Sequence, residues 1–373
     1  MKRIQANIVL WLLLTGVGAN SQSVNVASFK DAFKDKFYIG VALNRHQAMN
    51  DNAAEHKLVS TEFNSISPEN DLKWENVHPL KDKYNFGPAD AYMKTGKDLN
   101  MFIIGHTLLW HSQTPKWVFE DDNGNLLNRD ALLERLRDHI NKVVGRYKGV
   151  IKGWDVVNEA LNEDGSLRDS KWRTIIGDDY IEKAFEYVHA ADPEAELYYN
   201  DYNLYKQEKC RGAVDIVKRL KAKGMPIKAV GEQGHYSLTS PSLNEVEATI
   251  KSLIEVGVQV NITELDISVL PDKGAAATAD VANNASYNKE LDPYKKGLPV
   301  EIEKKLADRY KTLFELFVKY KGTIDRVTFW GLSDKDSWLN NWPIRGRTNY
   351  PLPFNRDLRA KTEVKHGILQ TAK

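Results

Sequence analysis

Eight short apolar runs recur along the chain, each four or five residues long. Near-continuous hydrophobicity over this length is typical of strands in a parallel sheet that is buried on both faces. The runs lie at residues 37–41, 63–66, 101–104, 153–157, 196–199, 228–231, 258–262 and 326–330.

Segments with helical periodicity separate several of these runs, because their hydrophobic residues recur every three or four positions. Ser242 and Glu245 form a capping-box pattern, which marks the start of one such helix. Strands that alternate with helices predict βαβ units and therefore an α/β protein. Eight strands favour closure into a (β/α)8 TIM barrel, with the active site at their C-terminal ends. The other clear stripes are Leu132, Leu136, Ile140, Val143 and Tyr147; Tyr180, Ala184 and Val188; and Ile302, Leu306, Tyr310, Leu313 and Phe317.

A doubly wound open sheet is the alternative arrangement. No Gly-x-Gly-x-x-Gly pattern follows an early strand, which counts weakly against the dinucleotide-binding version of that fold. No Ser/Thr/Pro-rich linker divides the chain, so a single catalytic domain over residues 22–373 is expected. The polar stretch at 271–299 is too long for a tight connection and is expected to be a surface excursion.

The first 21 residues have the features of a secretory signal peptide. Lys2 and Arg3 precede a short apolar run at residues 8–14, and small residues suited to cleavage follow around Ala19. An uncleaved membrane anchor is the alternative, but the apolar run is shorter than the roughly 20 residues that a spanning helix needs. We therefore expect residues 1–21 to be removed and the protein to be secreted or periplasmic, with no membrane partner afterwards.

Composition and charge exclude several functional classes. The 373 residues carry 52 Lys and Arg against 51 Asp and Glu, so the formal net charge is +1. This balance gives no electrostatic reason to expect nucleic acid as a partner. The one cysteine, Cys210, excludes an intramolecular disulfide framework and a cysteine-rich metal cluster. The 9 Trp exceed what a core requires, which indicates indole side chains in a binding site.

Two glutamates directly follow apolar runs and are the strongest catalytic candidates. Glu159 ends the segment 154–159, and Glu264 ends the segment 260–264. In a closed barrel, the ends of the fourth and seventh strands can face each other across the mouth. Two facing carboxyl groups, one of them kept protonated, can cleave a glycosidic bond. The alternative is that these glutamates cap helices or pair with Lys or Arg.

Aromatic and polar residues follow the other strands and would meet at the same rim. Sugar rings lie flat on indole faces, and their hydroxyl groups need amide, carboxylate and ammonium partners. The expected platforms are Trp74, Trp110, Trp330 and Trp338. The expected hydroxyl-binding residues are Asn70, Lys73, His106, Asn158 and Gln233. For each tryptophan, plain packing is the alternative, and it is preferred for Trp117, Trp154 and Trp172.

Metal and serine-nucleophile chemistry fit the sequence less well. His106, His111 and His235 could supply three zinc ligands with an open position. They share no helical turn, and neither a His-Glu-x-x-His nor a Gly-x-Ser-x-Gly pattern occurs. No cofactor and no catalytic metal are expected.

Six motifs together resemble those of a known family. They are SPENDLKW at 67–74, GHTLLWHSQ at 105–113, WDVVNEA at 154–160, GEQGH at 231–235, ITELD at 262–266 and WGLSDKDSW at 330–338. An isolated Asn-Glu pair is a weak signal, whereas six motifs in this order are specific. From about Phe37 to about Phe354, the chain resembles glycoside hydrolase family 10, the endo-β-1,4-xylanases.

The resemblance implies a (β/α)8 barrel and a retaining, double-displacement mechanism. Glu159 matches the general acid/base and Glu264 the nucleophile, with their carboxyl groups about 5–5.5 Å apart. Asn158 matches the residue that holds the 2-hydroxyl of the sugar being cleaved. His235 matches the residue bonded to the nucleophile, and Asp266 is expected to orient its imidazole.

The resemblance also implies binding positions on the glycone side of the cleft. Trp330 and Trp338 would crowd the space that the hydroxymethyl group of glucose needs, which favours xylose. The expected substrates are xylan and xylo-oligosaccharides, and the protein is expected to be a monomer. The matching positions are Glu69, Asn70, Lys73, His106, Trp110, Gln233, Trp330 and Trp338.

The mechanism places opposite requirements on the two glutamates. Glu159 has to be protonated near neutral pH while Glu264 stays ionised, and the charge of Glu264 is expected to raise the pKa of Glu159. A mixed-specificity β-1,4-glycanase, acting also on cellulose-type or aryl β-glycosides, shares both glutamates and stays the alternative. A non-catalytic sugar-binding barrel is expected to lack one of them, and a dehydrogenase needs a nucleotide-binding motif.

Overall fold

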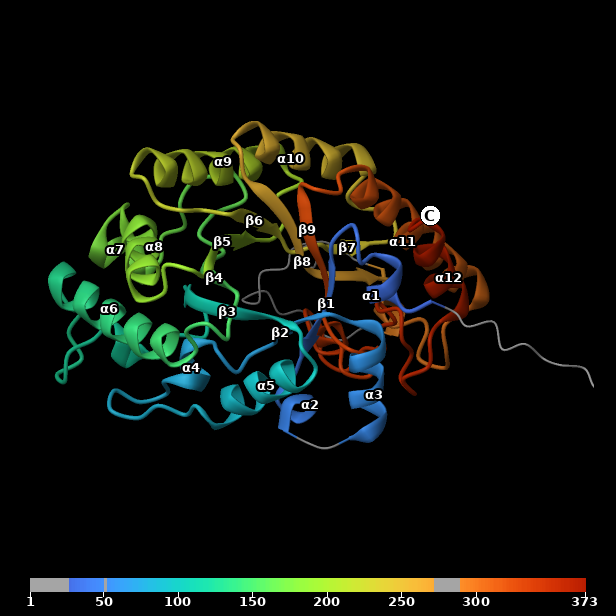
Figure 1. Ribbon diagram of the computed structural model, residues 1–373, viewed down its shortest axis with the longest axis horizontal. Helices are drawn as coiled ribbons and strands as arrows, with labels where there is room; N and C mark the ends of the chain where they lie inside the picture. The colour runs from blue at the N-terminus through green and yellow to red at the C-terminus, as the bar shows by residue number, and fades with distance from the viewer. Residues whose placement is uncertain (1–26, 50–51, 272–288) are drawn as a thin grey trace, which may run out of the picture.

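Parallel strands form a closed barrel in the computed structural model, and helices surround them (Figure 1). The structure describes residues 27–49, 52–271 and 289–373. The barrel strands are β1 (Tyr38–Leu43), β2 (Ser65–Pro68), β3 (Phe102–Trp110), β4 (Gly153–Asn158), β5 (Glu196–Asp201), β6 (Ala229–Glu232), β8 (Gln259–Ser268) and β9 (Ile324–Phe329).

The order of the strands confirms the predicted (β/α)8 barrel. Neighbours run β6-β5-β4-β3-β2-β1-β9-β8, and pairing of β6 with β8 closes the ring. All of these pairings are parallel. Each apolar run singled out in the sequence overlaps one barrel strand. The open-sheet alternative is wrong because the sheet has no free edge between β6 and β8.

One short strand lies outside the ring and was not predicted. Strand β7 (His235–Ser237) pairs in parallel with the end of β8, so that His235 lies opposite Asp266. It is three residues long and has no apolar run. A sequence pattern therefore gives little sign of it.

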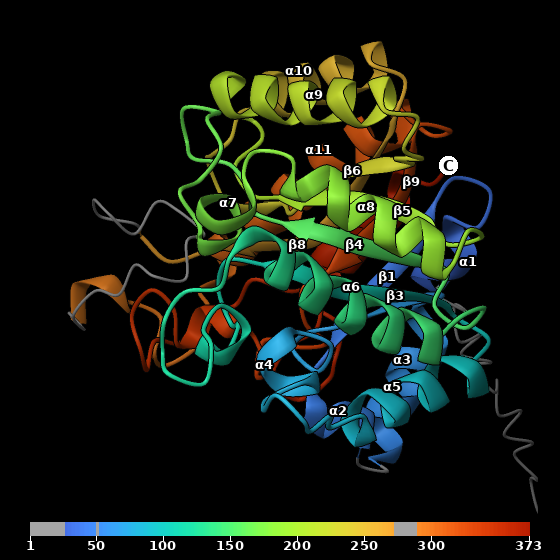
Figure 2. The same ribbon diagram turned by 90° about the vertical axis from the view of Figure 1, so that its left-hand side faces the viewer.

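Helices follow most of the strands and cover the outside of the barrel. Figure 2 shows α9 and α10 side by side along one flank of it. The helices are α1 (Phe29–Ala32), α2 (Arg45–Met49), α3 (Ala53–Glu62), α4 (Trp74–Val77), α5 (Gly87–Asp98), α6 (Arg129–Arg146), α7 (Lys171–Ile176), α8 (Tyr180–Ala191), α9 (Gln207–Ala222), α10 (Leu243–Glu255), α11 (Val300–Lys319) and α12 (Thr362–Gln370). Short 3-10 turns are η1 (Lys116–Val118), η3 (Lys289–Leu291) and η4 (Trp338–Asn340).

The predicted helical signals fall on observed helices. The three apolar stripes lie on α6, α8 and α11, where most of their residues are buried. The capping box at the start of α10 is complete, because Ser242 accepts from the Glu245 N–H and the Glu245 carboxylate accepts from the Ser242 N–H.

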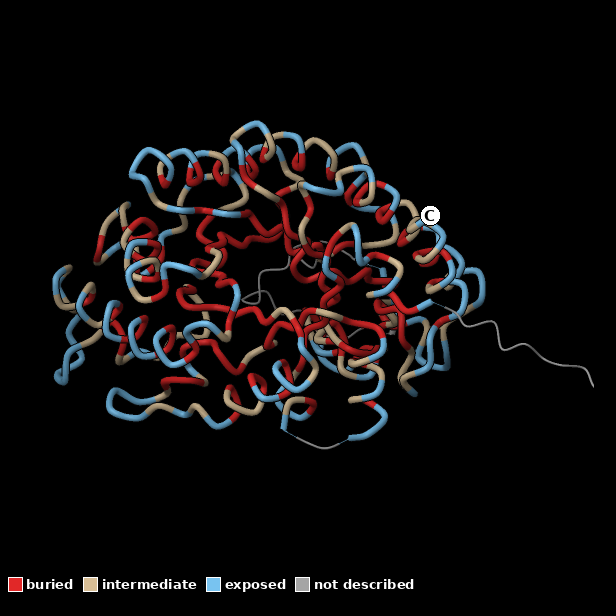
Figure 3. The backbone as a smooth tube through the Cα atoms, in the orientation of Figure 1, coloured by how far each residue is buried: buried red, intermediate tan, exposed pale blue. Residues whose placement is uncertain are grey.

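The core is continuous between the strands and the inner faces of the helices. Figure 3 shows buried residues along the strands and exposed residues on the outer sides of the helices. Trp154 is 1% exposed, and a Cβ at Gly105 would lie 2.1 Å from its indole ring. The glycine therefore leaves room for Trp154, whose assignment to structural packing is confirmed.

Irregular register occurs in the strands that end at the cleft. The pairing shifts between His106 and Leu109 on β3, between Asp155 and Val157 on β4, and between Ile262 and Leu265 on β8. Such bulges re-aim side chains next to active sites. The shift on β4 lies directly before Glu159, and the shift on β8 spans Glu264.

Two predictions concern residues beyond the described ranges. The signal peptide at 1–21 lies outside them, as does most of the stretch at 271–299. No helix within the described ranges is long and apolar enough to cross a membrane.

Candidate active site

The predicted catalytic and binding residues, except Trp74, meet in one pocket at the C-terminal ends of the barrel strands. The pocket has a volume of about 140 Å³. Gln113, the last residue of the motif at 105–113, lines it as well, although the sequence assigned it no binding role. The lining residues are Glu69, Asn70, Lys73, His106, Trp110, Gln113, Asn158, Glu159, Gln233, His235, Glu264, Trp330 and Trp338.

Glu159 follows the last residue of β4 and is surrounded by neutral donors. It is 5% exposed. Its Oε2 accepts from the Trp110 indole N–H at 2.8 Å, and its Oε1 accepts from the Gln233 amide at 3.0 Å. Burial raises the pKa of Glu159, and the negative charge of Glu264 raises it further. The sequence predicted only the second cause, which is the smaller one.

Glu264 lies within β8 and accepts from one neutral amide and from the His235 ring. Its Oε1 accepts from the Asn200 amide at 2.8 Å, and its Oε2 lies 3.3 Å from Nε2 of His235. Burial opposes ionisation, but the hydrogen bond from His235 and the nearby positive charges, including Lys73, outweigh it. The pKa of Glu264 is therefore lowered.

His235 lies between two carboxylates, as the family resemblance implied. Its Nδ1 is 3.0 Å from Asp266 Oδ1, while Nε2 contacts Glu264. Burial acts against protonation of His235, but the Asp266 charge and the two hydrogen bonds raise its pKa to about 10. The imidazolium therefore donates through both nitrogens. Trp338 donates its indole N–H to Asp266 Oδ2 at 2.8 Å, which fixes the carboxylate that orients the ring.

Asn200 is a site residue for which the sequence predicted no role. Its amide nitrogen donates both to Glu264 and to Asn158 Oδ1, the latter at 2.9 Å. Its own Oδ1 accepts from the Thr263 hydroxyl at 2.6 Å. A Cβ at Gly231 would lie 2.2 Å from this oxygen, so the glycine makes room for it. The sequence feature that could have indicated a role for Asn200 is its position directly after the fifth apolar run, at residues 196–199.

Lys73 brings a buried positive charge to one wall of the pocket. Its Nζ donates to Asn70 Oδ1 at 2.9 Å and to Gln113 Oε1 at 3.1 Å. It lies 4.8 Å from the centre of the Trp110 ring. Burial lowers the pKa of Lys73 and raises that of Glu69. The same wall continues into a neighbouring groove, which Glu69, Asn70 and Gln113 also line.

His106 and the two tryptophans of the last loop form the rest of the wall. His106 Nδ1 is 2.9 Å from Asp155 Oδ2, and its ring lies edge-on to Trp330 with centroids 5.3 Å apart. Trp338 lies 4.8 Å from His235 and stacks on Trp342 with centroids 4.6 Å apart. Trp330 and Trp338 therefore enclose the side of the pocket that contains the His235 imidazolium.

The prediction that Trp74 is a sugar platform is wrong. Trp74 is 2% exposed and does not line the pocket. It begins α4, which turns its indole away from the cleft and onto the His139 ring, with centroids 3.6 Å apart. Trp172, which was assigned to structure, is buried and donates its N–H to the Trp110 carbonyl at 2.9 Å.

The histidines considered as zinc ligands all lie in the ranges 27–49, 52–271 and 289–373 that the structure describes. No group of three or more His, Cys, Asp or Glu side chains there is arranged to hold a metal ion. The histidines of the pocket contact carboxylates instead.

Comparison with known proteins identifies the family. Residues 28–368 match the family described as Glycosyl hydrolase family 10. The chain belongs to this family. All six motifs fall within the matched residues, and so do all of the residues that line the pocket.

Relatives of this family 10 chain are similar over nearly its whole length. Endo-1,4-beta-xylanase A of Xylanibacter ruminicola is 43% identical over 359 residues, covering 96% of this chain and 97% of that protein. Beta-1,4-xylanase of Dictyoglomus thermophilum is 40% identical over 366 residues, with the same shares covered. A family 10 endoxylanase from a sugarcane soil metagenome has a solved structure that matches with a TM-score of 0.90 and 43% identity, covering 92% of this chain and 99% of that one.

Proposed function

We propose that the protein is a retaining endo-1,4-β-xylanase that hydrolyses internal β-1,4-xylosidic bonds of xylan. The observation that carries the proposal is a pair of buried glutamates in one cleft whose pKa values shift in opposite directions. Such a pair assigns the acid and the nucleophile of glycoside hydrolysis. Membership of glycosyl hydrolase family 10 supports it, as do the xylanase names of relatives at 40–43% identity.

The first step forms a glycosyl-enzyme. Ionised Glu264 attacks the anomeric carbon, and the bond to the leaving oxygen breaks. Protonated Glu159 gives its proton to that oxygen, so the leaving sugar departs as a neutral alcohol. The Asn200 amide holds one oxygen of Glu264 and His235 the other, which aims the carboxylate before attack.

The second step releases the product with retained configuration. Glu159, now ionised, takes a proton from water while the water oxygen attacks the anomeric carbon. The ester bond to Glu264 breaks and its carboxylate is restored. Once Glu264 is esterified, its charge no longer raises the pKa of Glu159, which makes Glu159 a better base for this step.

Xylose preference would come from the tryptophan wall. Trp330 and Trp338 enclose the side of the pocket next to His235, where a hydroxymethyl group of glucose would need space. We assign glycone binding to this wall together with Glu69, Asn70 and Lys73.

A product profile on beechwood-type xylan, arabinoxylan and carboxymethylcellulose tests the proposal. We expect a ladder of xylo-oligosaccharides at early times, a rapid fall in viscosity, and little release from carboxymethylcellulose. Proton NMR of the first product should show the β-anomer before mutarotation. Release of only monomer from chain ends, or of the α-anomer first, would contradict the assignment. Comparable rates on carboxymethylcellulose would favour the mixed-specificity glycanase.

We further propose that residues 1–21 are a signal peptide and that residues 22–373 act outside the cytoplasm. The positive start, short apolar run and small residues of the N-terminal segment support this. Mass spectrometry of the protein from periplasmic and culture fractions tests it. An N-terminus that begins near residue 22 is expected, and an intact N-terminus in the cytoplasmic fraction would contradict it.

A further inference from the structure

The backbone at Glu159 is strained, and strand β5 holds it in place. Glu159 has φ = 56°, in the left-handed region that disfavours every residue with a Cβ atom. Its N–H donates to the Asn200 carbonyl at 2.9 Å. The following N–H, of Ala160, donates to the Tyr199 hydroxyl at 3.2 Å. Surrounding structure has to maintain such a conformation, because the residue itself disfavours it.

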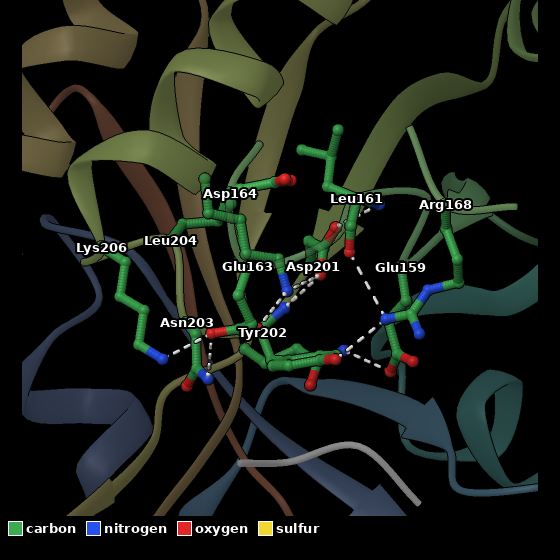
Figure 4. Close-up of polar contacts among 12 residues, drawn as sticks. Glu159, Leu161, Glu163, Asp164, Arg168, Asp201, Tyr202, Asn203, Leu204 and Lys206 are labelled. Carbon is green, nitrogen blue, oxygen red and sulfur yellow. Dashed lines mark hydrogen bonds and ion pairs between the residues drawn. The ribbon is translucent and has the colours of Figure 1, made fainter. Parts of the chain in front are cut away.

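Asp201 binds the third consecutive amide. Its Oδ2 accepts from the Leu161 N–H at 3.3 Å and also from the Tyr199 hydroxyl. Its Oδ1 accepts from the Tyr202 N–H at 2.9 Å and lies 3.0 Å from Nζ of Lys209. Figure 4 shows Asp201 beside the loop that follows Glu159. The N–H groups of residues 159, 160 and 161 are thus all bonded to residues of β5.

Lys209 compensates the buried charge of Asp201. Both side chains are completely buried, and a buried charge without its partner is strongly destabilising. The Lys209 ammonium also lies 3.1 Å from Glu163 Oε1 and 3.4 Å from the centre of the Tyr202 ring. It therefore joins α9 to the end of β5 and to the loop after β4, which carries Glu163.

We propose that Tyr199, Asp201 and Lys209 are positioning residues that hold Glu159 where it can protonate the leaving oxygen. We call these three residues the acid/base cradle. The proposal rests on the function assigned above and adds residues that do not line the pocket. The cradle contacts the backbone, because Trp110 and Gln233 hold the carboxyl group itself, and the Lys209 charge also acts through space to lower the pKa of Glu159.

The role of the cradle predicts a dependence on the leaving group. A displacement of about 1 Å in a catalytic group can cost around 100-fold in rate. Protonation matters only when the leaving group is a poor one, such as a sugar hydroxyl. With an activated aryl β-xylobioside, glycosylation needs no acid, and kcat/KM reports that step alone. A loss of positioning should therefore affect xylotetraose far more than the activated substrate.

Three variants test the cradle at different points. Lys209→Met keeps a long chain but removes the ammonium. Asp201→Asn combined with Lys209→Met removes both charges and keeps an oxygen to accept from Leu161. Tyr199→Phe removes only the hydroxyl bonded to Ala160 and Asp201, with no buried charge left unpaired.

We expect kcat/KM of Lys209→Met on xylotetraose to fall about 100-fold. On 2,4-dinitrophenyl β-xylobioside it should fall less than about threefold, because glycosylation there needs no acid. Tyr199→Phe should lose about 10-fold on xylotetraose, as expected for one hydrogen bond. The double variant should recover part of the loss of Lys209→Met, because no buried carboxylate is left unpaired. If Lys209→Met does not fold, Tyr199→Phe and the double variant carry the test.

Lys365→Met is the matched control. Lys365 pairs with Glu62, which is also largely buried and accepts from the backbone N–H of Phe29, and neither residue lines the pocket. The Lys365→Met variant should have a lower melting temperature, but the ratio of its kcat/KM values on the two substrates should be unchanged.

Equal losses on the two substrates in folded cradle variants, or no loss on xylotetraose, would overturn the proposal. Glu159→Ala in the same assay separates this outcome from failure of the proposed function. If Glu159→Ala also shows no leaving-group dependence, the acid/base assignment itself is wrong.

Discussion

The surroundings of Glu159 and of Glu264 differ, although the two side chains are equally buried. Each is 5% exposed and lies in the same pocket. Among the described residues, Glu159 accepts from an indole and an amide, which carry no charge. Glu264 accepts from an amide and from His235, whose other nitrogen contacts Asp266.

This difference shows that burial alone does not decide which carboxyl group ionises. Burial opposes the charge of both, and it is the largest single influence on each pKa. Around Glu264, the His235 imidazolium and Lys73 outweigh burial, so the pKa of Glu264 is lowered. Around Glu159, the negative charge of Glu264 adds to the effect of burial. One cleft therefore holds an acid and a nucleophile of the same residue type.

The largest effect is expected from Glu264→Ala, because the reaction then has no nucleophile. Xylan hydrolysis should fall on the order of 10⁴-fold or more. Reducing-sugar release at neutral pH measures it, with the exposed Glu255→Ala on α10 as a folded control of the same substitution. Substantial residual activity in Glu264→Ala would mean that the double-displacement assignment is wrong.

Glu159→Ala should have a large but selective effect. Hydrolysis of xylan should fall about 10²–10⁴-fold, the usual contribution of general acid–base catalysis. On an activated aryl β-xyloside the glycosyl-enzyme still forms but is not hydrolysed efficiently. Added azide should then restore turnover and give a β-xylosyl azide, detected by mass spectrometry and NMR. If the azide product had the α-configuration, or if azide restored no turnover, the assignment of Glu159 as acid/base and Glu264 as nucleophile would be wrong.

His235→Asn tests the cause of the difference. The acid limb of the kcat/KM profile reports ionisation of Glu264, and His235 lowers the pKa of Glu264. Without the imidazolium, Glu264 should ionise at higher pH, so the acid limb should move to higher pH. We expect a loss of roughly 10–100-fold near neutral pH. An acid limb that stays in place would show that His235 does not set the charge of Glu264.

The fold and most of the cleft could be predicted because they depend on simple regularities. Each barrel strand is buried on both faces and therefore appears as an apolar run. The C-terminal ends of parallel strands meet at one rim, so residues such as Glu159 and Glu264 can be placed without knowing their contacts. His235 and Asp266 could be paired because their motifs matched a family.

What could not be predicted depends on the direction of single side chains. Trp74 adjoins Lys73 in one motif, yet it begins a helix, and its indole stacks on the His139 ring. Lys209 lies on the buried side of α9, where a lysine in the sequence gives no sign of a buried charge. Its partner Asp201 is adjacent to Asn200, but only the three-dimensional structure shows that it binds the Leu161 amide.

The contrast between the two glutamates extends to a buried histidine outside the cleft. His139 stacks on Trp74, and its Nδ1 is 3.2 Å from Nδ1 of His78. Nε2 of His78 lies 3.1 Å from the Lys81 carbonyl, so that nitrogen carries the proton and His139 donates to His78. Burial lowers the pKa of His139 well below its usual value, and the nearby Lys142 ammonium acts in the same direction. His235, which contacts two carboxylates, shifts the opposite way.

The smallest effect we predict is therefore on stability rather than on activity. Below pH about 6.5 the unfolded chain takes up a proton at His139 that the folded chain does not. The free energy of unfolding should then decrease by up to about 1.4 kcal/mol per pH unit, until the lowered pKa of the folded state is reached. In His139→Phe, which keeps a ring on Trp74, urea unfolding at pH 7.5 and pH 5 should show a smaller decrease. The exposed His366→Phe should keep the decrease of the parent chain. An unchanged pH dependence in His139→Phe would mean that His139 is already charged in the folded protein, and that burial without a carboxylate neighbour does not keep a histidine neutral here.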